Sequence, residues 1–350
     1  MGNWRDNVRH VVPYVPGEQP QKKVIKLNTN ENPYPPAKGV DEIMKTVDSD
    51  IFRLYPDPEC MVLRKAIADR YNTETDNVFV GVGSDDVISV AFLTFFNSDK
   101  KVLFPNITYS FYTVWADLYG IDYELIPVDK NFRIHKEDYY KENGGVVFAN
   151  PNAPTSIGEP LDFVIDILEN NKDVVVIVDE AYVDFGGESA VELTKKYDNL
   201  LVVQTFSKSR SMAGMRIGYA IGNSELIKAM SDVKYSINSY TLNQVSLKSG
   251  VAAIEDEAYF KETVNKIVAT RERVKKELKE LGFEFPDSKT NFIFAKHESV
   301  PSKHIFEELK KVDIYVRYFS APIVNEYLRI TIGTDEEMDK FIEELKKIIK

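Results

Sequence analysis

The chain has 350 residues, of which 43% are hydrophobic and 28% are charged, and its formal net charge is −11. This profile is typical of a soluble globular protein, and the length favours two domains. The negative charge argues against nucleic acid and anionic membranes as partners, so local arginines would have to capture an anionic substrate.

The single cysteine, Cys60, excludes a disulfide framework and favours a reducing compartment. It lies beside an apolar helical face and is interpreted as a packed thiol, not a nucleophile. The N-terminal sequence MGNWRDNVRHVVPYVPG lacks the apolar core of a signal peptide, and no run approaches the ~20 apolar residues of a membrane span. We therefore expect a cytoplasmic protein. The four histidines are scattered without metal-ligand spacing, so no metal site is expected.

Residues 1–40 are rich in proline, asparagine and glycine, and such a segment forms few backbone hydrogen bonds of its own. Its apolar and aromatic side chains, including Tyr14, Leu27 and Tyr34, favour docking over disorder. We predict an N-terminal arm that docks on a small domain or on a dimer partner.

Residues 41–240 are predicted to form a large domain. Residues 41–50 and 58–71 have helical periodicity, and short apolar runs then alternate with helix-like stretches. The apolar runs are NVFVGV, KVLFP, YELIPV, GGVVFA, VVVIV and NLLVVQ. Their nearly continuous Val, Ile, Leu and Phe content is typical of parallel strands covered on both faces. The pattern predicts an α/β fold, a three-layer arrangement around a mainly parallel sheet.

Residues 241–350 are predicted to form a smaller α+β domain. Residues 247–281 are expected to form one long charged helix that stops at Gly282. Three strand-like segments and a final amphipathic helix follow; they are NFIFAK, DIYVRYF, YLRITIG and DEEMDKFIEELKKIIK.

Polar residues follow several of the apolar runs of the large domain. NPNAPTS follows GGVVFA, DEAY follows VVVIV, TFSK follows NLLVVQ, and GSDD follows NVFVGV and begins a helix. The carboxyl ends of parallel strands share one edge of the sheet, and ligands bind there. Each segment alone is an ordinary cap, turn or packing residue. Together they predict a site, and its members are Gly83, Ser84, Asn152, Asp179, Tyr182, Ser207 and Lys208, with Arg216 from the return strand.

This set of groups suits pyridoxal phosphate. Lys208 offers an amine for the cofactor's aldehyde, and Asp179 offers a carboxylate that keeps the ring nitrogen protonated. Such a charge pair has roughly 4 kcal/mol of Coulomb energy at ~4 Å and an effective dielectric of ~20. Tyr182 and an asparagine suit the ring oxygen. Helix amides, hydroxyls and a guanidinium would hold the phosphate, and they come from Gly83, Ser84, Ser207, Ser209 and Arg216.

The order of six segments resembles the fold-type I aminotransferases over nearly the whole chain; they are YPDPE, GVGSDD, TYSFY, NPNAPTS, DEAYVDF and TFSKSRSMAGMRIGY. PYVPGEQ, KLNTNENPYPP, VKYSINSYT and YLRITIGT make the histidinol-phosphate aminotransferase branch the most similar. The resemblance implies an aspartate-aminotransferase-like fold and a pyridoxal-phosphate-dependent transaminase of histidine biosynthesis. It would convert L-histidinol phosphate and 2-oxoglutarate into imidazole acetol phosphate and L-glutamate.

The resemblance also implies roles for residues at the cofactor. Lys208 resembles the lysine that holds the cofactor and moves the proton in transamination. Asp179 resembles the partner of the pyridine nitrogen, and Tyr182 the donor to the ring oxygen. The segment Gly83-Ser84-Asp85, with Ser207 and Arg216, resembles the phosphate site, and Tyr109 resembles the residue stacked on the ring.

Further positions resemble residues of the substrate pocket and of the neighbouring subunit. Tyr55 resembles the tyrosine that reaches the phosphate from the partner subunit, which implies a homodimer with shared active sites. Arg329 resembles the arginine that binds the substrate carboxylate. Tyr14, Asn30 and Arg317 resemble substrate-pocket positions, and Arg317 is suited to a substrate phosphate.

The sequence departs from the family pattern at two places. The usual asparagine directly precedes the proline, whereas here Asn152 is followed by Ala153, and Ser156 replaces a glycine. The ring-oxygen contact is assigned to Asn152, and the offset of one residue leaves that assignment open. Arg210 replaces a small or aromatic residue; it either adds to the phosphate site or, as we favour, points to solvent.

Other functions compete with this prediction. Threonine-phosphate decarboxylase and aromatic-amino-acid aminotransferase share the fold and cofactor site. A cofactor-sensing module of a regulator normally needs an output domain, and no basic DNA-reading region precedes residue 41. A nucleotide-binding protein built on GVGSDD would leave Lys208, Asp179 and Tyr182 unexplained.

Overall fold

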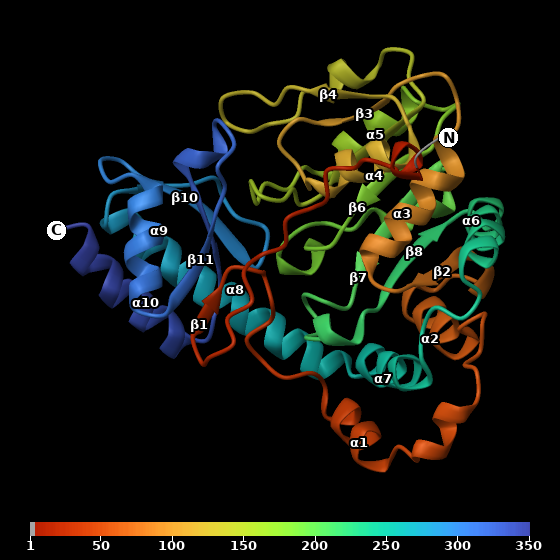
Figure 1. Cartoon of the computed structure of the whole chain (residues 1–350), viewed down its shortest axis with the longest axis horizontal. Helices are drawn as coiled ribbons and strands as arrows, with labels where there is room; N and C mark the ends of the chain where they lie inside the picture. Colours follow the sequence, from red (N-terminus) through yellow and green to blue (C-terminus); the bar gives the residue numbers. More distant parts are fainter. Residues whose placement is uncertain (1–3) are drawn as a thin grey trace.

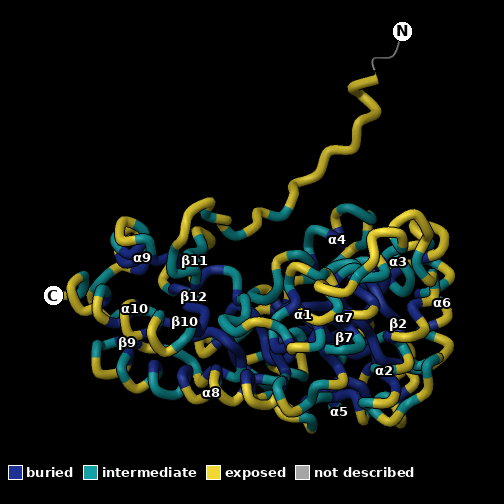
Figure 2. Tube along the Cα trace, turned by 90° about the horizontal axis from the view of Figure 1, so that it is seen from below, coloured by how far each residue is buried: buried dark blue, intermediate teal, exposed yellow. Residues whose placement is uncertain are grey.

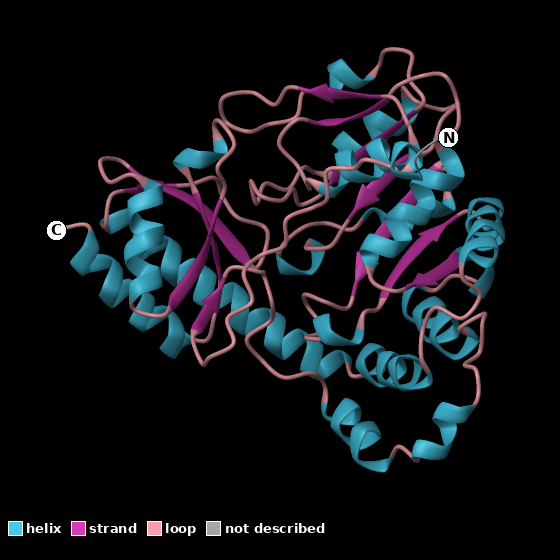
Figure 3. Ribbon diagram, viewed as in Figure 1, coloured by secondary structure: helices cyan, strands magenta, loops and turns pink. Residues whose placement is uncertain are grey.

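The computed structural model describes residues 4–350, which form two α/β units side by side (Figure 1). The larger unit is built on a seven-stranded sheet and the smaller on a five-stranded sheet (Figure 3). Among the described helices, none is long and apolar enough to cross a membrane. The predicted α/β fold with a large sheet and a smaller second unit is confirmed.

The large sheet has the strand order β2-β8-β7-β6-β5-β3-β4. In that order the strands are Val78–Gly81, Gly218–Gly222, Leu200–Thr205, Val176–Asp179, Gly145–Ala149, Val102–Pro105 and Tyr123–Ile126. All neighbours pair in parallel except β8, which is antiparallel to both β2 and β7. Each of the six apolar runs thus forms a strand, and the glycine-containing run after Arg216 forms β8.

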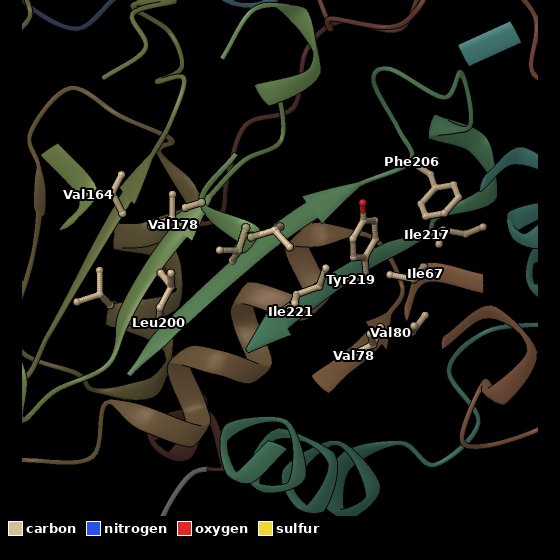
Figure 4. Close-up of a cluster of buried hydrophobic side chains, with 14 of the residues drawn as sticks. Ile67, Val78, Val80, Val164, Val178, Leu200, Phe206, Ile217, Tyr219 and Ile221 are labelled. Atoms are coloured by element: carbon tan, nitrogen blue, oxygen red, sulfur yellow. The ribbon is translucent and has the colours of Figure 1, made fainter. Parts of the chain in front are cut away.

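Helices cover both faces of the large sheet. Alternate residues of one strand point to opposite faces, so Leu200 and Val202 belong to one core cluster and Leu201 and Val203 to the other. The helices on the first face are α2 Met61–Tyr71, α5 Leu161–Glu169 and α7 Gln244–Glu255, and α1 Lys38–Thr46 packs on α7 (Figure 1). Those on the second face are α3 Ser84–Phe95, α4 Phe111–Tyr119 and α6 Ser224–Ile237. Burial on both faces explains why the strands are continuously apolar; Figure 4 shows part of the first cluster.

The small sheet has the order β1-β11-β12-β10-β9. Its strands are Ile25–Leu27, Ile314–Tyr318, Leu328–Thr331, Phe292–His297 and Phe283–Glu284. The helices α8 Glu257–Glu280, α9 Ser302–Lys311 and α10 Asp335–Ile348 complete the unit. Short 3-10 helices occupy Trp4–Asn7, Ser49–Arg53, Thr75–Asn77, Lys136–Tyr139, Val183–Phe185, Ala190–Lys195, Ala213–Met215 and Val324–Glu326.

The segment before β1 contributes to both units. β1, which was not predicted from the sequence, pairs in parallel with β11 of the small sheet. The exposed trace before β1 stands out from the body in Figure 2. The guanidinium of Arg9 nevertheless donates to the carbonyl of Leu118 in α4. The division at residues 40 and 240 stays a prediction.

The single helix expected over residues 247–281 is wrong. The chain forms two helices, α7 and α8, which meet at Asp256. Asp256 has a non-helical backbone (φ −83°, ψ 68°), and its carboxylate accepts a hydrogen bond from the Tyr259 N–H as an N-terminal cap of α8. Helical periodicity on both sides concealed the break. Figure 1 shows α8 running on from α7 to the small sheet.

Candidate active site

A cavity of about 480 Å³ opens between the carboxyl ends of the central strands of the large sheet and the small unit. Most of the predicted site residues line it. They are Tyr14, Asn30, Ser84, Asp85, Tyr109, Asp179, Tyr182, Ser207, Lys208, Arg216, Arg317 and Arg329. The structure therefore brings together residues that are far apart in the sequence, from Tyr14 to Arg329.

Lys208 lies just after β7 with its amine at the cavity. Its Nζ donates a hydrogen bond to the carbonyl of Thr29, 3.1 Å away, and lies 5.8 Å from the centroid of the Tyr182 ring. The side-chain amide of Asn32 donates to the Lys208 carbonyl at 3.0 Å and so fixes the backbone of the lysine. The N-terminal segment thus holds both ends of this residue.

Asp179 is the last residue of β6 and is almost fully buried. Burial raises the pKa of its carboxyl to about 6. Two donors oppose the rise: the Tyr112 hydroxyl lies 3.0 Å from Oδ2, and the Ala181 N–H lies 3.1 Å from Oδ1. Sequence reasoning missed Tyr112, because a tyrosine on the buried face of a helix resembles ordinary packing.

The start of α3 and the return strand β8 form an anion-binding corner. Gly83 precedes α3 with φ +85°, a backbone conformation that favours glycine. A Cβ on Gly83 would lie 2.4 Å from Nη2 of Arg216, and a Cβ on Gly218 would lie 2.2 Å from the N of Ser84. Side chains are therefore excluded at both positions, and free helix amides and a guanidinium meet there.

Some hydroxyl groups next to this corner lie at the cavity, and one is bonded to a residue away from it. Thr205 and Ser207 both line the cavity, and their hydroxyls are 3.0 Å apart. Thr205 was not predicted. Ser209 does not line the cavity, because its hydroxyl donates to Oδ2 of Asp184 at 2.5 Å. The prediction that Ser209 adds to the phosphate site is therefore wrong.

Tyr182 is the clearest donor among the residues that were predicted to contact the cofactor's ring oxygen. Tyr182 is nearly buried at the cavity, and its hydroxyl accepts a 2.9 Å hydrogen bond from Nδ2 of Asn30. Asn152 lies outside the lining: its Nδ2 donates to the Ile107 carbonyl and to the Thr155 hydroxyl. Ala153, which has no polar side chain, lines the cavity instead.

Aromatic rings and arginines form the outer part of the cavity. Tyr14 stacks on Phe111 with centroids 4.3 Å apart, and the Tyr109 hydroxyl donates to Oδ1 of Asp85 at 2.8 Å. Arg317 and Arg329 face each other across β11 and β12. Both line the cavity, and burial lowers the pKa of Arg329.

Two other predicted positions lie away from the cavity. The side chain of Tyr55 is 79% exposed and stacks on Tyr240 with centroids 4.4 Å apart. Arg210, expected in solvent, is buried; it donates to the Ala253 carbonyl at 2.5 Å and lies over the Phe260 ring. That carbonyl belongs to the last turn of α7, where helix carbonyls lack intrahelical partners. Cys60 is buried, as expected, and burial raises the pKa of its thiol to about 11.

These residues fit pyridoxal phosphate. An amine and a deeply buried carboxylate lie at the same cavity, and neither forms a salt bridge among the described residues. The corner at Gly83 and Gly218 has room only in the absence of side chains and offers cationic and N–H donors for a phosphate. The donor set is thus matched to a cofactor with an aldehyde, a basic ring nitrogen and a phosphate.

The chain matches the family of class I and II aminotransferases over residues 22–345. It belongs to this family, and it is a pyridoxal-phosphate-dependent transaminase. The histidinol-phosphate aminotransferase of Brachyspira hyodysenteriae is 52% identical over 347 residues, 99% of this chain and 98% of that protein. That of Clostridium beijerinckii is 50% identical over 347 residues, 99% of this chain and 97% of that protein.

Solved structures agree on the fold. Histidinol-phosphate aminotransferase from Sinorhizobium meliloti, in complex with pyridoxal-5'-phosphate, has a TM-score of 0.85 and 23% identity. The comparison covers 94% of this chain and 92% of that one. L-threonine-O-3-phosphate decarboxylase from Porphyromonas gingivalis has a TM-score of 0.80 and 18% identity, with coverage of 93% and 99%. At these identities the likeness concerns the fold alone.

Proposed function

We propose that this transaminase moves the amino group of L-histidinol phosphate to 2-oxoglutarate in histidine biosynthesis. The observation that best supports an anionic substrate is the pair Arg317 and Arg329. These two arginines lie opposite each other on β11 and β12, and both line the cavity. Relatives about half identical over almost their full length carry the name histidinol-phosphate aminotransferase, which supports this choice among anionic substrates.

The two paired arginines favour the binding of an anionic substrate. Like charges directly opposite on neighbouring strands are unfavourable. Arg317 donates to the carbonyls of Val15 and Pro16, and Arg329 to that of Asn28, so among the described residues no carboxylate neutralises either. A phosphate, or the carboxylates of a 2-oxo acid, would relieve this repulsion. Guanidinium groups bind either anion through paired oxygens, so one pocket can serve both substrates.

The other residues have separate tasks in the reaction. Bound pyridoxal phosphate supplies an electron sink, which makes the substrate carbon that bears the amine acidic. Nζ of Lys208, which lies at the cavity, would accept the proton from that carbon and donate it again later in the reaction. The Asp179 carboxylate would keep a proton on the ring nitrogen, and the Tyr182 hydroxyl would donate to the ring oxygen. The turn Gly83-Ser84-Asp85, with Ser207 and Arg216, would hold the phosphate of the cofactor, and Tyr109 would contact its ring.

We also propose that the active protein is a cytoplasmic homodimer in which Tyr55 completes the partner's site. An aromatic side chain this exposed is unusual, and other large apolar side chains are exposed close to it in the sequence. They are Phe52, Leu54 and Met61, and Tyr240 stacks on Tyr55. A second copy of the chain would cover them.

Mixed dimers test the shared site. Lys208→Ala and Tyr55→Ala variants are purified separately, dissociated and reassociated together. If Tyr55 serves the partner's site, mixed dimers regain activity at the one site with both residues intact. If Tyr55 serves its own site, or the protein is a monomer, no activity returns on mixing.

An absorbance scan with pyridoxal phosphate tests the reaction. We expect a visible band of the lysine-bound cofactor that L-histidinol phosphate abolishes and 2-oxoglutarate restores. Lys208→Ala should lack the band. Release of carbon dioxide from threonine phosphate would favour the decarboxylase instead, and a strong preference for tyrosine or phenylalanine would favour an aromatic aminotransferase. A band that responds to none of these compounds would contradict a transaminase or decarboxylase role and favour a cofactor-sensing module.

A further inference from the structure

The geometry points to Asn30 as a positioning residue for the hydroxyl of Tyr182. Asn30 orients the Tyr182 hydroxyl so that the hydroxyl hydrogen faces the cavity. This orientation strengthens the hydrogen bond that Tyr182 would donate to the cofactor's ring oxygen. This inference rests on the cofactor site and on the proposed role of Tyr182, but it does not depend on which substrate the enzyme takes. In this proposal Asn30 positions Tyr182, whereas the sequence analysis expected Asn30 to contact the substrate directly.

All four polar groups of Asn30 have hydrogen-bond partners. Its Nδ2 donates to the Tyr182 hydroxyl at 2.9 Å, and its Oδ1 accepts from the Thr331 hydroxyl at 3.0 Å. Its backbone N–H donates to the same Thr331 oxygen at 3.0 Å, and its carbonyl accepts from Nδ2 of Asn291 at 2.9 Å. Asn30 is 1% exposed, so water does not compete for these bonds.

The direction of the hydrogen bonds follows from the backbone. An N–H can only donate, so the Thr331 oxygen accepts from Asn30 and its own hydrogen turns to Oδ1 of the amide. The amide therefore presents its NH₂ group to Tyr182. Because the Tyr182 oxygen already accepts this bond, its hydrogen is free to point into the cavity. The opposite amide orientation would leave the Thr331 hydrogen without an acceptor.

The bond matters because the ring-oxygen side has few other donors. Nδ2 of Asn152 is used by Ile107 and Thr155, and Ala153 at the cavity wall has nothing to donate. Tyr182 is thus the main side-chain donor available to the cofactor's ring oxygen. A hydrogen bond donated to a hydroxyl oxygen polarises its O–H group and makes it a stronger donor in turn.

The backbone conformation of Asn30 suits this role. Its φ is +57°, in the left-handed region that asparagine, aspartate and glycine tolerate best. Among these three, only asparagine has a side-chain amide that can accept from Thr331 and donate to Tyr182 simultaneously. Asn30 also ties the N-terminal segment to Thr331 of β12 in the small unit and to Tyr182, three residues after the end of β6.

The test is a pH titration of the visible band of the cofactor-loaded protein. This band reports the proton on the lysine nitrogen, and a well-stabilised ring oxygen holds that proton less tightly. Asn30→Gly removes the amide without backbone strain. We expect it to raise the titration midpoint by about 0.3–1 pH unit, the equivalent of one hydrogen bond of about 0.5–1.5 kcal/mol.

Two further variants sharpen the test. Asn30→Asp keeps the backbone and the shape but accepts a hydrogen bond from Tyr182, which turns the hydroxyl away, so its midpoint should rise more than that of Asn30→Gly. Asn72→Gly is a matched control, because Asn72 also has positive φ (+49°) but caps α2 far from the cavity. Its midpoint should equal that of wild type.

The dependence on Tyr182 is tested in a Tyr182→Phe background. There Asn30→Gly should cause no further shift, since the hydroxyl through which Asn30 acts is absent. An equal shift in both backgrounds, or none in either, would overturn the role of Asn30 alone. A wild-type band that does not change with pH would overturn the assignment of Lys208 and Tyr182 to the cofactor, and the role of Asn30 with it. Melting temperatures of all variants show whether each is folded.

Discussion

The hydroxyl of Tyr112 donates a 3.0 Å hydrogen bond to Oδ2 of Asp179 inside the large unit. Tyr112 lies on α4 and is fully buried, so this bond is shielded from water. It lowers the pKa of Asp179 against the effect of burial, which raises that pKa to about 6. Tyr112 thus favours the ionised form of this carboxylate, as the proposed role of Asp179 at the cofactor's ring nitrogen requires.

The first prediction follows from this bond. Tyr112→Phe should raise the pKa of Asp179 further and weaken cofactor binding, by about 10- to 150-fold for a lost hydrogen bond to a charged group. The dissociation constant is measured by absorbance titration with pyridoxal phosphate. Tyr139→Phe is the control, because Tyr139 is also buried but its hydroxyl has no hydrogen-bond partner among residues 4–350. A Tyr112→Phe protein that binds as tightly as the control would contradict the prediction.

The second prediction concerns the stability of the cofactor-free protein. The folded pKa of Asp179 (about 6) lies above its ordinary value of 3.8, so the folded state binds this proton more tightly. The free energy of unfolding should therefore fall as the pH rises through this window, by about 3 kcal/mol from this group.

Asp179→Asn removes that contribution. The difference in unfolding free energy between variant and wild type should grow in the variant's favour from pH 4 to pH 7. Urea denaturation across this range measures it. Buried Glu180, with a pKa raised to about 7, is present in both proteins and cancels in the difference. Parallel profiles of unfolding free energy against pH for the two proteins would show that Asp179 is not the source of the pH dependence.

The third prediction concerns the anion-binding corner. An alanine Cβ at position 218 would lie 2.2 Å from the Ser84 nitrogen and 2.3 Å from the Gly83 carbonyl carbon, and neither backbone atom can move freely. Gly218→Ala should destabilise the protein by about 1–3 kcal/mol and lower cofactor affinity by at least tenfold. Gly214→Ala is the control, since a Cβ there meets nothing within 4 Å. Equal affinities of the two variants would place the phosphate elsewhere.

The fourth prediction concerns Arg210. Arg210→Met should destabilise the protein by about 1–3 kcal/mol, because it leaves the Ala253 carbonyl at the end of α7 without its donor. Thermal and urea denaturation measure the change. Arg53→Met, at an exposed arginine that pairs with Asp50, should change stability by less than about 0.5 kcal/mol. A solvent-exposed Arg210 would make the two variants indistinguishable.

Much of the fold could be predicted from the sequence because its signals are local. The apolar runs became strands, and their lack of polar alternation indicated a sheet covered on both faces. The break at Asp256 was not visible, since helical periodicity continues on both sides of it. β1 has three residues in a proline-rich segment, and it forms a strand only because β11 is available beside it.

The sequence by itself determined which chemical groups follow the strands, and therefore the family and the cofactor. Strand, turn and helix patterns place Lys208, Asp179 and the turn at Gly83 at one edge of the sheet. Only the tertiary structure decided the partners of these groups. The bonds of Asn30 to Tyr182 and Thr331, of Tyr112 to Asp179 and of Arg210 to Ala253 join distant segments. Such pairs depend on how sheets and helices pack, and no local pattern in the chain specifies them.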